Sequence, residues 1–352
     1  MLEKEYVQNV HTTDFVLFEE GVMNRNYYIF KSGTLQRKDN SIRVVTEDKI
    51  KKDIPCETVS DLYIFGEINL NTKLLNFLAQ KEILLHLFNY YGFYSGSFSP
   101  REKNVSGFLL VKQVEYYSEY EKRLILAKKF IDAASYNIYR NVRYYKGRGI
   151  ALENVLNEIA SLREKLNWTN SIEELMGIEG NIRKKYYESW NDIIKQNINF
   201  TKRVKNPPEN MINTLLSFAN SLVYTTALAE IYKTQLNPTV SYLHEPGVAR
   251  FSLSLDIAEI FKPLIAERMI FSLLNKNMIS EDDFEKESNY LYLKESARKI
   301  IVEEYDKRLQ RTIKHKKLNR DVSYRYLFRL ECYKLIKHLT EEKEYEGFKI
   351  WW

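Results

Sequence analysis

The sequence is poor in cysteine. Its 352 residues include only two cysteines, Cys56 and Cys332, and it contains no C-x-x-C pair. A disulfide framework or a zinc ribbon requires several cysteines at close spacing, so both are excluded. Two isolated thiols are typical of a protein kept in a reducing compartment, and we expect a cytoplasmic location.

Long apolar runs are also missing. The first residues, Met1–Tyr6, are charged and lack the apolar core of a signal peptide. No hydrophobic stretch reaches the length needed to cross a bilayer, so we expect no membrane partner. The sequence also lacks the motifs of a P-loop, a dinucleotide-binding fold and a G-x-S-x-G serine hydrolase.

The composition is that of a globular protein with a mild positive charge. Hydrophobic residues make up 44% and charged residues 28% of the chain, which is long enough for two domains with a buried core. The net charge of +6 and the isoelectric point near 8.9 permit a polyanionic partner without requiring one.

The first part of the chain has the pattern of a small β domain. Short segments rich in β-branched and aromatic residues predict strands, and Lys38–Asn40 has the composition of a hairpin turn. The apolar spacing of Leu74, Leu75 and Leu78 predicts one short helix over residues 72–80. We therefore assign residues 1–104 to a mostly β domain. The expected strands are Tyr27–Phe30, Ser41–Val45, Val59–Phe65 and Ile83–Phe88.

After Phe108 the apolar residues follow a helical period. Ser171–Glu174 is a capping-box sequence and predicts the start of a helix. Helical patterning continues from Asp256 to the C-terminus, so residues 105–352 are predicted to form an all-α domain. The fold class is α+β with two domains, and the larger helical domain is expected to be the catalytic one.

Three separate stretches supply residues suited to one divalent-metal site. Glu179 lies on a predicted helix between Gly177 and Gly180, and His244 lies in a loop. Asp256 and Glu259 are one turn apart on a second helix, where two acids repel each other unless a cation lies between them. Taken singly, Glu179 and His244 are more often structural than functional. Together, carboxylates and an imidazole are suitable ligands for Mn²⁺ or Mg²⁺.

Basic residues are concentrated between Lys307 and Lys337, where the only acids are Asp321 and Glu331. Aromatic residues alternate with the cations, as in proteins that bind phosphates and stack on bases. A solvated, charged helix face explains the same pattern equally well. The candidate DNA contacts in the whole chain are Arg183, Arg250, Lys262, Arg311, Lys314, Arg320 and Arg325.

Over nearly its whole length the chain resembles the CRISPR-associated adaptation endonuclease family, the integrase subunit that inserts spacers into CRISPR arrays. The resemblance implies that Glu179, His244 and Glu259 are metal ligands, with Asp256 either a ligand or a supporting residue. It also implies a homodimer held by the β domain and assembly with a small ferredoxin-like partner around double-stranded prespacer and repeat DNA. The matching stretches are Ile54–Val59, Ile64–Gly66, Asn71–Leu78, Phe88–Phe98, Gly177–Gly180, Asn213–Tyr224, Leu243–Gly247 and Phe251–Pro263.

The activity expected from this resemblance is metal-assisted transesterification, in which a DNA 3′-hydroxyl attacks a phosphodiester of the repeat. Two alternatives remain. Water in place of the 3′-hydroxyl would make the protein a hydrolytic nuclease for branched or single-stranded nucleic acid. A non-catalytic DNA-binding scaffold is the third possibility, although the presence of all three motifs argues against it.

Overall fold

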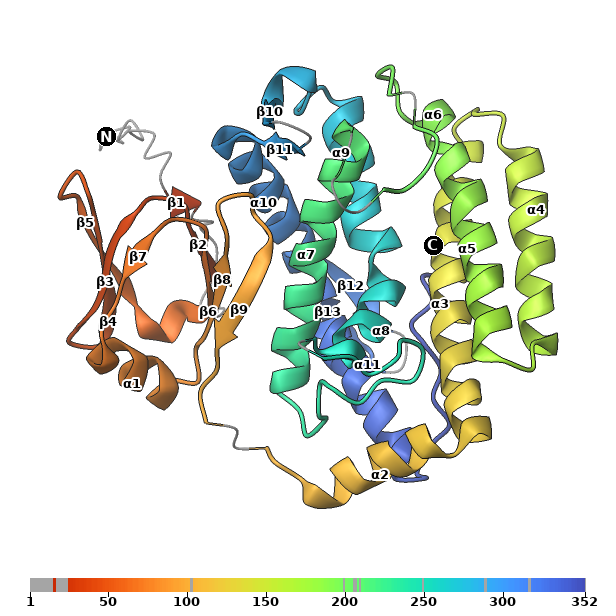
Figure 1. Cartoon of the computed structure of the whole chain (residues 1–352), viewed down its shortest axis with the longest axis horizontal. Coiled ribbons are helices and arrows are strands. Elements are labelled where there is room, and N and C mark those ends of the chain that lie inside the picture. The colour runs from red at the N-terminus through yellow and green to blue at the C-terminus, as the bar shows by residue number, and fades with distance from the viewer. Residues whose placement is uncertain are drawn as a thin grey trace, which may run out of the picture. The chain divides into compact units, whose positions relative to one another are not determined.

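The computed structural model describes residues 15–16, 25–101, 104–198, 200–204, 208, 210–248, 250–287, 290–315 and 318–351. The chain forms two compact units, residues 1–101 and residues 102–352. The first contains most of the strands and the second most of the helices (Figure 1). The predicted α+β class, with a β-rich region followed by a mostly helical one, is confirmed.

The β unit consists of two sheets and one helix. The five-stranded sheet has the order β1-β2-β6-β8-β9, and the four-stranded sheet has the order β5-β4-β3-β7. In the larger sheet β2, β6 and β8 are parallel, and β9 closes one edge in the antiparallel direction. The bounds are β1 Phe15–Val16, β2 Arg25–Ile29, β3 Gly33–Lys38, β4 Ser41–Thr46, β5 Lys51–Pro55, β6 Val59–Ile64, β7 Ile68–Asn69, α1 Thr72–Gln80, β8 Leu84–Phe88 and β9 Tyr94–Phe98.

Both sheets contribute to one apolar core. In β4 the residues alternate, so Ile42 and Val44 are buried while Arg43 between them is partly exposed. Helix α1 places Leu74, Phe77 and Leu78 in the same cluster of buried residues. Asn71 begins this helix, because its side chain accepts a hydrogen bond from the Leu74 amide at 3.0 Å.

The helical unit is built around two groups of helices. Helices α3, α4 and α5 pack side by side, and α7 packs against both α8 and α11 (Figure 1). In the described part of this chain, no helix combines the length and apolar character required to cross a membrane. The bounds are α2 Gly107–Ser118, α3 Tyr120–Lys146, α4 Glu153–Glu164, α5 Ile172–Glu188, α6 Trp190–Ile193, α7 Met211–Tyr232, α8 Ser252–Phe261, α9 Arg268–Asn275, α10 Glu295–Gln310 and α11 Tyr324–Leu339.

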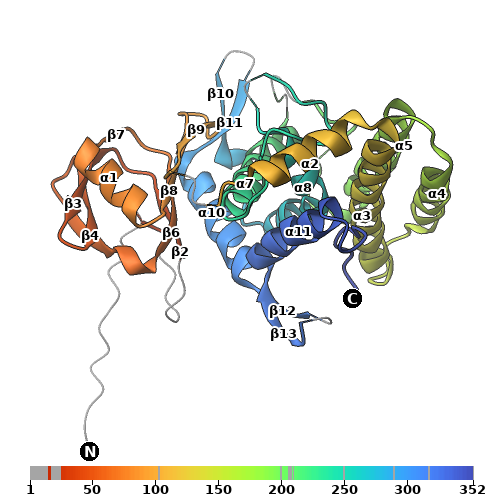
Figure 2. The ribbon, with the colours of Figure 1, turned by 90° about the horizontal axis from the view of Figure 1, so that it is seen from below.

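The prediction of an uninterrupted helical region after Asp256 was wrong. Two antiparallel hairpins interrupt it: β10 (Phe284–Glu287) with β11 (Tyr290–Leu293), and β12 (Thr312–His315) with β13 (Arg320–Ser323). The second hairpin extends away from the helices of its unit (Figure 2). Its strands pair Ile313 with Val322, and such short two-stranded ribbons leave a weak periodic signal in a charged sequence.

A π-helical turn, Pro263–Glu267, joins α8 to α9. The Glu267 amide donates to the Lys262 carbonyl at 3.0 Å, five residues earlier. Two asparagine side chains of α3 donate to carbonyls at this bend: Asn137 to that of Ile260 at 3.0 Å, and Asn141 to that of Pro263 at 2.8 Å. Because Pro263 has no amide hydrogen, the α-helical ladder cannot continue through it, as its position in the sequence predicts.

Candidate functional site

Helix α5 presents Glu179 on a face left open by two glycines. The helix begins at Ser171, whose hydroxyl accepts a hydrogen bond from the Glu174 amide at 3.1 Å. Apart from its chain neighbours and the backbone of its own helix, a Cβ atom added at Gly177 or Gly180 would meet no described atom within 4 Å. Packing within the protein therefore does not require these glycines, and they leave free space on either side of Glu179.

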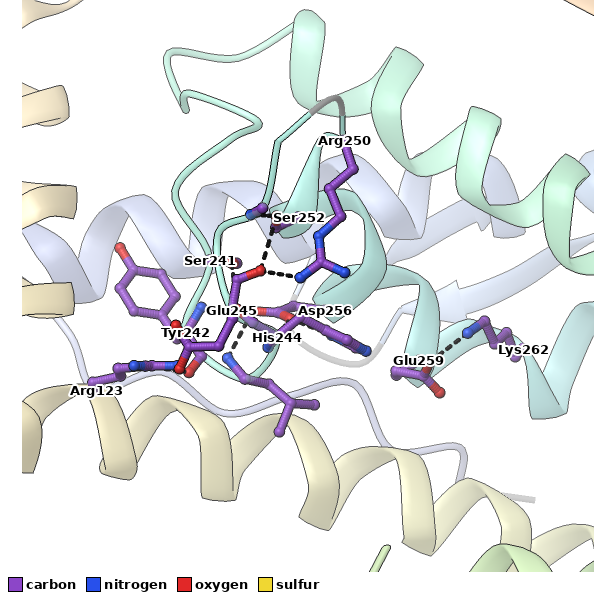
Figure 3. Close-up of polar contacts among 12 residues, drawn as sticks. Arg123, Ser241, Tyr242, His244, Glu245, Arg250, Ser252, Asp256, Glu259 and Lys262 are labelled. Atoms are coloured by element: carbon purple, nitrogen blue, oxygen red, sulfur yellow. Dashed lines mark hydrogen bonds and ion pairs between the residues drawn. The ribbon is translucent and has the colours of Figure 1, made fainter. Parts of the chain in front are cut away.

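His244 is held by the buried carboxylate of Asp256. One carboxylate oxygen accepts hydrogen bonds from the amides of Tyr242 at 2.7 Å and Leu243 at 3.0 Å. The other lies 3.0 Å from the His244 amide and 2.8 Å from its ring Nδ1. Figure 3 shows the loop folded around this carboxylate.

These contacts determine what each side chain can do. An ionised carboxylate only accepts hydrogen bonds, so Nδ1 of His244 carries a hydrogen, and in the neutral ring Nε2 then keeps a free lone pair. Asp256 is fully buried and is occupied by four donors. Of the two roles left open by the sequence, the geometry favours the supporting one for Asp256.

A second set of contacts ties the same loop to α2 and α3. Arg123 donates to the Tyr242 carbonyl at 2.9 Å and to the Glu245 carboxylate at 2.6 Å. Tyr117 donates to the same carboxylate at 2.9 Å. Arg250 is exposed and its guanidinium donates to the Glu245 carbonyl (Figure 3). No sequence signal connects Arg123 or Tyr117 with this loop, because both lie more than a hundred residues before it.

The carboxylates on this side of the unit are bridged by two cations. Arg183 forms ion pairs with Glu179, with Glu259 and, at 3.1 Å, with Glu267. Lys262 pairs with Glu259 as well (Figure 3). Burial pushes the pKa of Glu259 upward, but the charges of Lys262 and Arg183 outweigh it and hold that pKa well below the usual range. Arg183, expected to contact DNA, is engaged with carboxylates and only 14% exposed.

Glu179, His244 and Glu259 line one cavity of about 640 Å³. Asp256 is not among its lining residues in the described part of the chain. Three segments that are far apart in the sequence therefore bring two carboxylates and an imidazole to a common space. The other lining residues are Ile131, Met176, Gly180, Arg183, Lys184, Tyr187, Thr201, Lys202, Arg203, Asn220, Leu243 and Lys262.

The chemistry of these donors fits a divalent cation, since carboxylate oxygens and an imidazole nitrogen suit Mn²⁺ and Mg²⁺. Their arrangement is not a closed metal site. Over the residues that the structure describes, no three His, Cys, Asp or Glu side chains are grouped so as to hold an ion. Both oxygens of Glu259 are already paired, one with Arg183 and the other with Lys262, so an ion bound there would compete with one of these two cations.

The predicted DNA contacts near the C-terminus are divided by the fold. Arg311, Lys314 and Arg320 are exposed on or beside the β12–β13 hairpin. Arg325, which we also expected to contact DNA, instead pairs at 2.8 Å with Glu230, whose side chain is fully buried. The helical pattern could not show this, because the partner lies on α7.

Comparison with known proteins agrees with the resemblance read from the sequence. The chain is 59% identical over 330 residues to the CRISPR-associated endonuclease Cas1 of Fusobacterium nucleatum subsp. nucleatum, covering 94% of this chain and 98% of that protein. It is 54% identical over 328 residues to the CRISPR-associated endonuclease Cas1 3 of Thermodesulfovibrio yellowstonii, covering 93% of this chain and 100% of that protein.

A solved structure shows the same fold. The Cas1 protein TM1797 of Thermotoga maritima superimposes with a TM-score of 0.81 at 39% identity, covering 92% of this chain and 100% of that one. The family model described as CRISPR associated protein Cas1 matches residues 27–307, which is well over half of the sequence. The chain therefore belongs to the Cas1 family of CRISPR-associated proteins.

Proposed function

We propose that this protein is a CRISPR adaptation integrase, which joins the 3′-hydroxyl ends of captured DNA to a phosphodiester of the CRISPR repeat. The observation that carries the proposal is the convergence of Glu179, His244 and Glu259 on one cavity in a chain of the Cas1 family. The mild positive charge of the chain agrees with a DNA substrate.

In this proposal Glu179, His244 and Glu259 hold Mn²⁺ or Mg²⁺. When bound, the ion supplies Lewis-acid polarisation of a phosphoryl oxygen and offsets the charge that develops on the reacting oxygens. The imidazole favours Mn²⁺ over Mg²⁺, because nitrogen is a softer donor than a carboxylate oxygen. Asp256 keeps the hydrogen on Nδ1 of His244, and this leaves the lone pair of Nε2 to coordinate the ion.

The remaining groups of the cavity position the phosphodiester and stabilise its charge. Lys262 and Arg183 lie beside the candidate ligands and are fixed cations for negative charge on the phosphate. In the joining step one P–O bond forms to the attacking 3′-oxygen and one breaks to the departing 3′-oxygen. The number of phosphodiester bonds is unchanged, so the reaction needs neither ATP nor a covalent enzyme intermediate.

The second candidate function is hydrolytic cleavage in the same cavity, with water as the nucleophile. It is favoured by the naming of similar proteins as endonucleases. A non-catalytic scaffold is disfavoured, because a scaffold has no need for three donors from separate segments to face one space. We infer that the protein works in the cytoplasm as a homodimer with a small ferredoxin-like partner.

The deciding experiment incubates the protein and its partner with linear prespacer DNA and a supercoiled plasmid that carries the repeat, in Mn²⁺. Joined products indicate integration, and nicks without joining indicate hydrolysis. We expect Glu179→Gln and His244→Ala each to abolish both reactions. Glu188→Gln, a change of an exposed acid on the same helix, is the matched control and keeps activity. Joining that survives both site substitutions would refute the site.

A further inference from the structure

The cavity has a second group of charged residues that neither the metal site nor the predicted DNA contacts include. Lys184, Lys202 and Arg203 line it together with the candidate ligands. Arg183 and Lys262 are compensated by carboxylates, whereas none of these three forms an ion pair with an acid among the residues that the structure describes. Among the described residues, no acid therefore balances the positive charge on this side of the cavity.

Arg203 is the most deeply placed of the three. Its guanidinium donates to the carbonyls of Val204 at 2.7 Å and Asn213 at 2.9 Å, to the Asn213 side chain at 3.0 Å and to the Ser217 hydroxyl at 2.8 Å. All of these acceptors are neutral. They fix the side chain without cancelling its charge, and burial lowers the pKa of Arg203. A partly buried cation with no acidic partner among the described residues suits an anion that completes the site.

The hydroxyl of Tyr187 adds a neutral donor to the same region. The residue is 8% exposed, and its oxygen accepts a hydrogen bond from Arg183 at 3.5 Å. Its own hydrogen meets no acceptor in the described part of the chain. Burial raises the pKa of Tyr187 to about 12, so the hydroxyl stays protonated at neutral pH. The ring is held by edge contacts with Trp190 and Phe200.

A further polar group in the cavity also lacks a partner. Asn220 of α7 lines the cavity, and its side-chain oxygen is buried without a hydrogen bond to any residue that the structure describes. An unpaired acceptor beside unpaired cations suits a ligand that carries both an anion and N–H or O–H donors. A nucleotide has these features, and a cavity of about 640 Å³ is large enough for more than an isolated phosphate ion.

We propose that Arg203 and the Tyr187 hydroxyl form a phosphate subsite that holds a backbone phosphodiester next to the reacting one, with Lys184 and Lys202 neutralising the strand at the mouth of the cavity. This subsite rests on the proposed function, because it takes the strand that is delivered to Glu179, His244 and Glu259. It fixes the register of that strand through one charge-assisted contact rather than through base identity.

The test replaces one charged phosphate of the DNA at a time with a neutral group and measures the binding affinity of the protein. EDTA is present so that no catalysis occurs. Single-stranded DNA is prepared with one methylphosphonate at each position in turn. For the wild-type protein we expect one position to weaken binding about tenfold. The Arg203→Gln variant should bind the natural strand about tenfold more weakly, and the same methylphosphonate should then cause no further loss.

Two smaller substitutions test the subsite in case Arg203→Gln does not fold. Tyr187→Phe removes only the hydroxyl and is expected to reduce the penalty at the same position, and Arg203→Lys keeps the charge and most of the binding. Lys185→Gln is the matched control, since Lys185 lies on the same helix, pairs with Glu158 and does not line the cavity. Thermal melting identifies any variant that is unfolded, in which case the Tyr187→Phe scan decides.

The outcomes separate this subsite from the proposed function. A penalty that persists unchanged in the Arg203 and Tyr187 variants, or the absence of any sensitive position, overturns the subsite. If the protein joins strands but no methylphosphonate position depends on Arg203, the subsite is refuted and the integrase assignment stands. If one methylphosphonate position depends on Arg203 but the protein neither joins nor cleaves DNA, the subsite stands and the integrase assignment is refuted.

Discussion

His244 and Asp256 form a pair in which the ring Nδ1 lies 2.8 Å from a carboxylate oxygen that also accepts the His244 backbone amide. One acid thus fixes both the backbone and the ring of the same residue. The ring is 22% exposed and the acid is fully buried. The two residues should therefore respond differently to substitution, although they serve the same site.

Replacing Asp256 with Asn should unfold the protein more easily and abolish activity. The amide group brings hydrogens toward backbone amides that already donate to this side chain. We expect the free energy of unfolding to fall by about 3 kcal/mol, measured by urea denaturation. His244→Gln is the comparison, because it should lose activity at a cost below about 1 kcal/mol. Unchanged stability of the Asp256 variant would contradict this role.

The pairing of Arg183 with Glu267 predicts a rescue by double substitution. Arg183→Met leaves the almost fully buried Glu267 without its cation, and we expect a loss of about 3–5 kcal/mol in guanidinium unfolding. Adding Glu267→Gln removes the uncompensated acid and should recover at least about 1 kcal/mol. Adding Glu188→Gln instead should recover nothing, because that acid is exposed. Strict additivity of the Arg183 and Glu267 changes would show that the two are independent.

The two glycines of α5 allow stability to be separated from substrate binding. The added methyl group of Gly177→Ala or Gly180→Ala meets no described atom outside its own helix within 4 Å, so both changes should raise the free energy of unfolding by about 0.5–1 kcal/mol. Gly180 lines the cavity, whereas Gly177 lines a separate hollow beside Trp168. Only Gly180→Ala should therefore weaken strand binding, as fluorescence anisotropy would report. Equal binding by the two variants would rule out strand entry along this face.

The β12–β13 hairpin should contribute to DNA affinity through charge alone. Lys314 is exposed, and Lys314→Gln should leave the melting temperature unchanged. It should reduce the slope of log K against log salt concentration by about 1. Arg325→Gln is expected to do the reverse, lowering stability through its buried partner Glu230 while leaving the salt slope intact. If Lys314→Gln leaves the slope of log K against log salt concentration unchanged, DNA does not contact this hairpin.

His338 should make the helical unit sensitive to acid. Burial lowers the pKa of His338, and its Nδ1 accepts a hydrogen bond from the Tyr345 amide at 3.2 Å, which only the neutral ring can do. As the pH falls, the unfolded chain takes up a proton on this residue first, near pH 6.5. Its contribution to stability is therefore present above that pH and is lost as the pH falls through the lower pKa of the folded state.

The measurement compares urea unfolding of the wild type and His338→Asn at about pH 7.5 and pH 5.5. Asparagine keeps an acceptor for the Tyr345 amide but does not titrate. The wild type should lose more stability between the two pH values than the variant. Equal losses would show that His338 is not the residue responsible.

The sequence predicted the order of the fold and the location of the three site segments. β-Branched and aromatic residues marked the strands β2, β4, β6 and β8, and the capping sequence at Ser171 marked the helix that carries Glu179. These signals are local, which is why they can be read from one chain. The motifs also matched a known family, and this resemblance, not the spacing, singled out Glu179, His244 and Glu259.

The partners of the site residues were not predictable in the same way. Arg183 was expected to contact DNA, but it pairs with Glu259 and Glu267, and these contacts depend on how α5 packs in three dimensions. Arg203 could not be identified from the sequence, because a single arginine in a loop has no periodic pattern. Its significance lies in its partners, which are the neutral groups of Asn213 and Ser217, and only the structure can show these.

The π-helical turn between Lys262 and Glu267 makes the length of this segment matter more than its composition. Such a turn holds one residue more than an α-helical turn. Deleting a single residue there would rotate α9 by about 100° relative to α8 and carry Glu267 away from Arg183. Evolution of this segment should therefore proceed by exchanging side chains, while insertions and deletions between Glu259 and Glu267 are selected against.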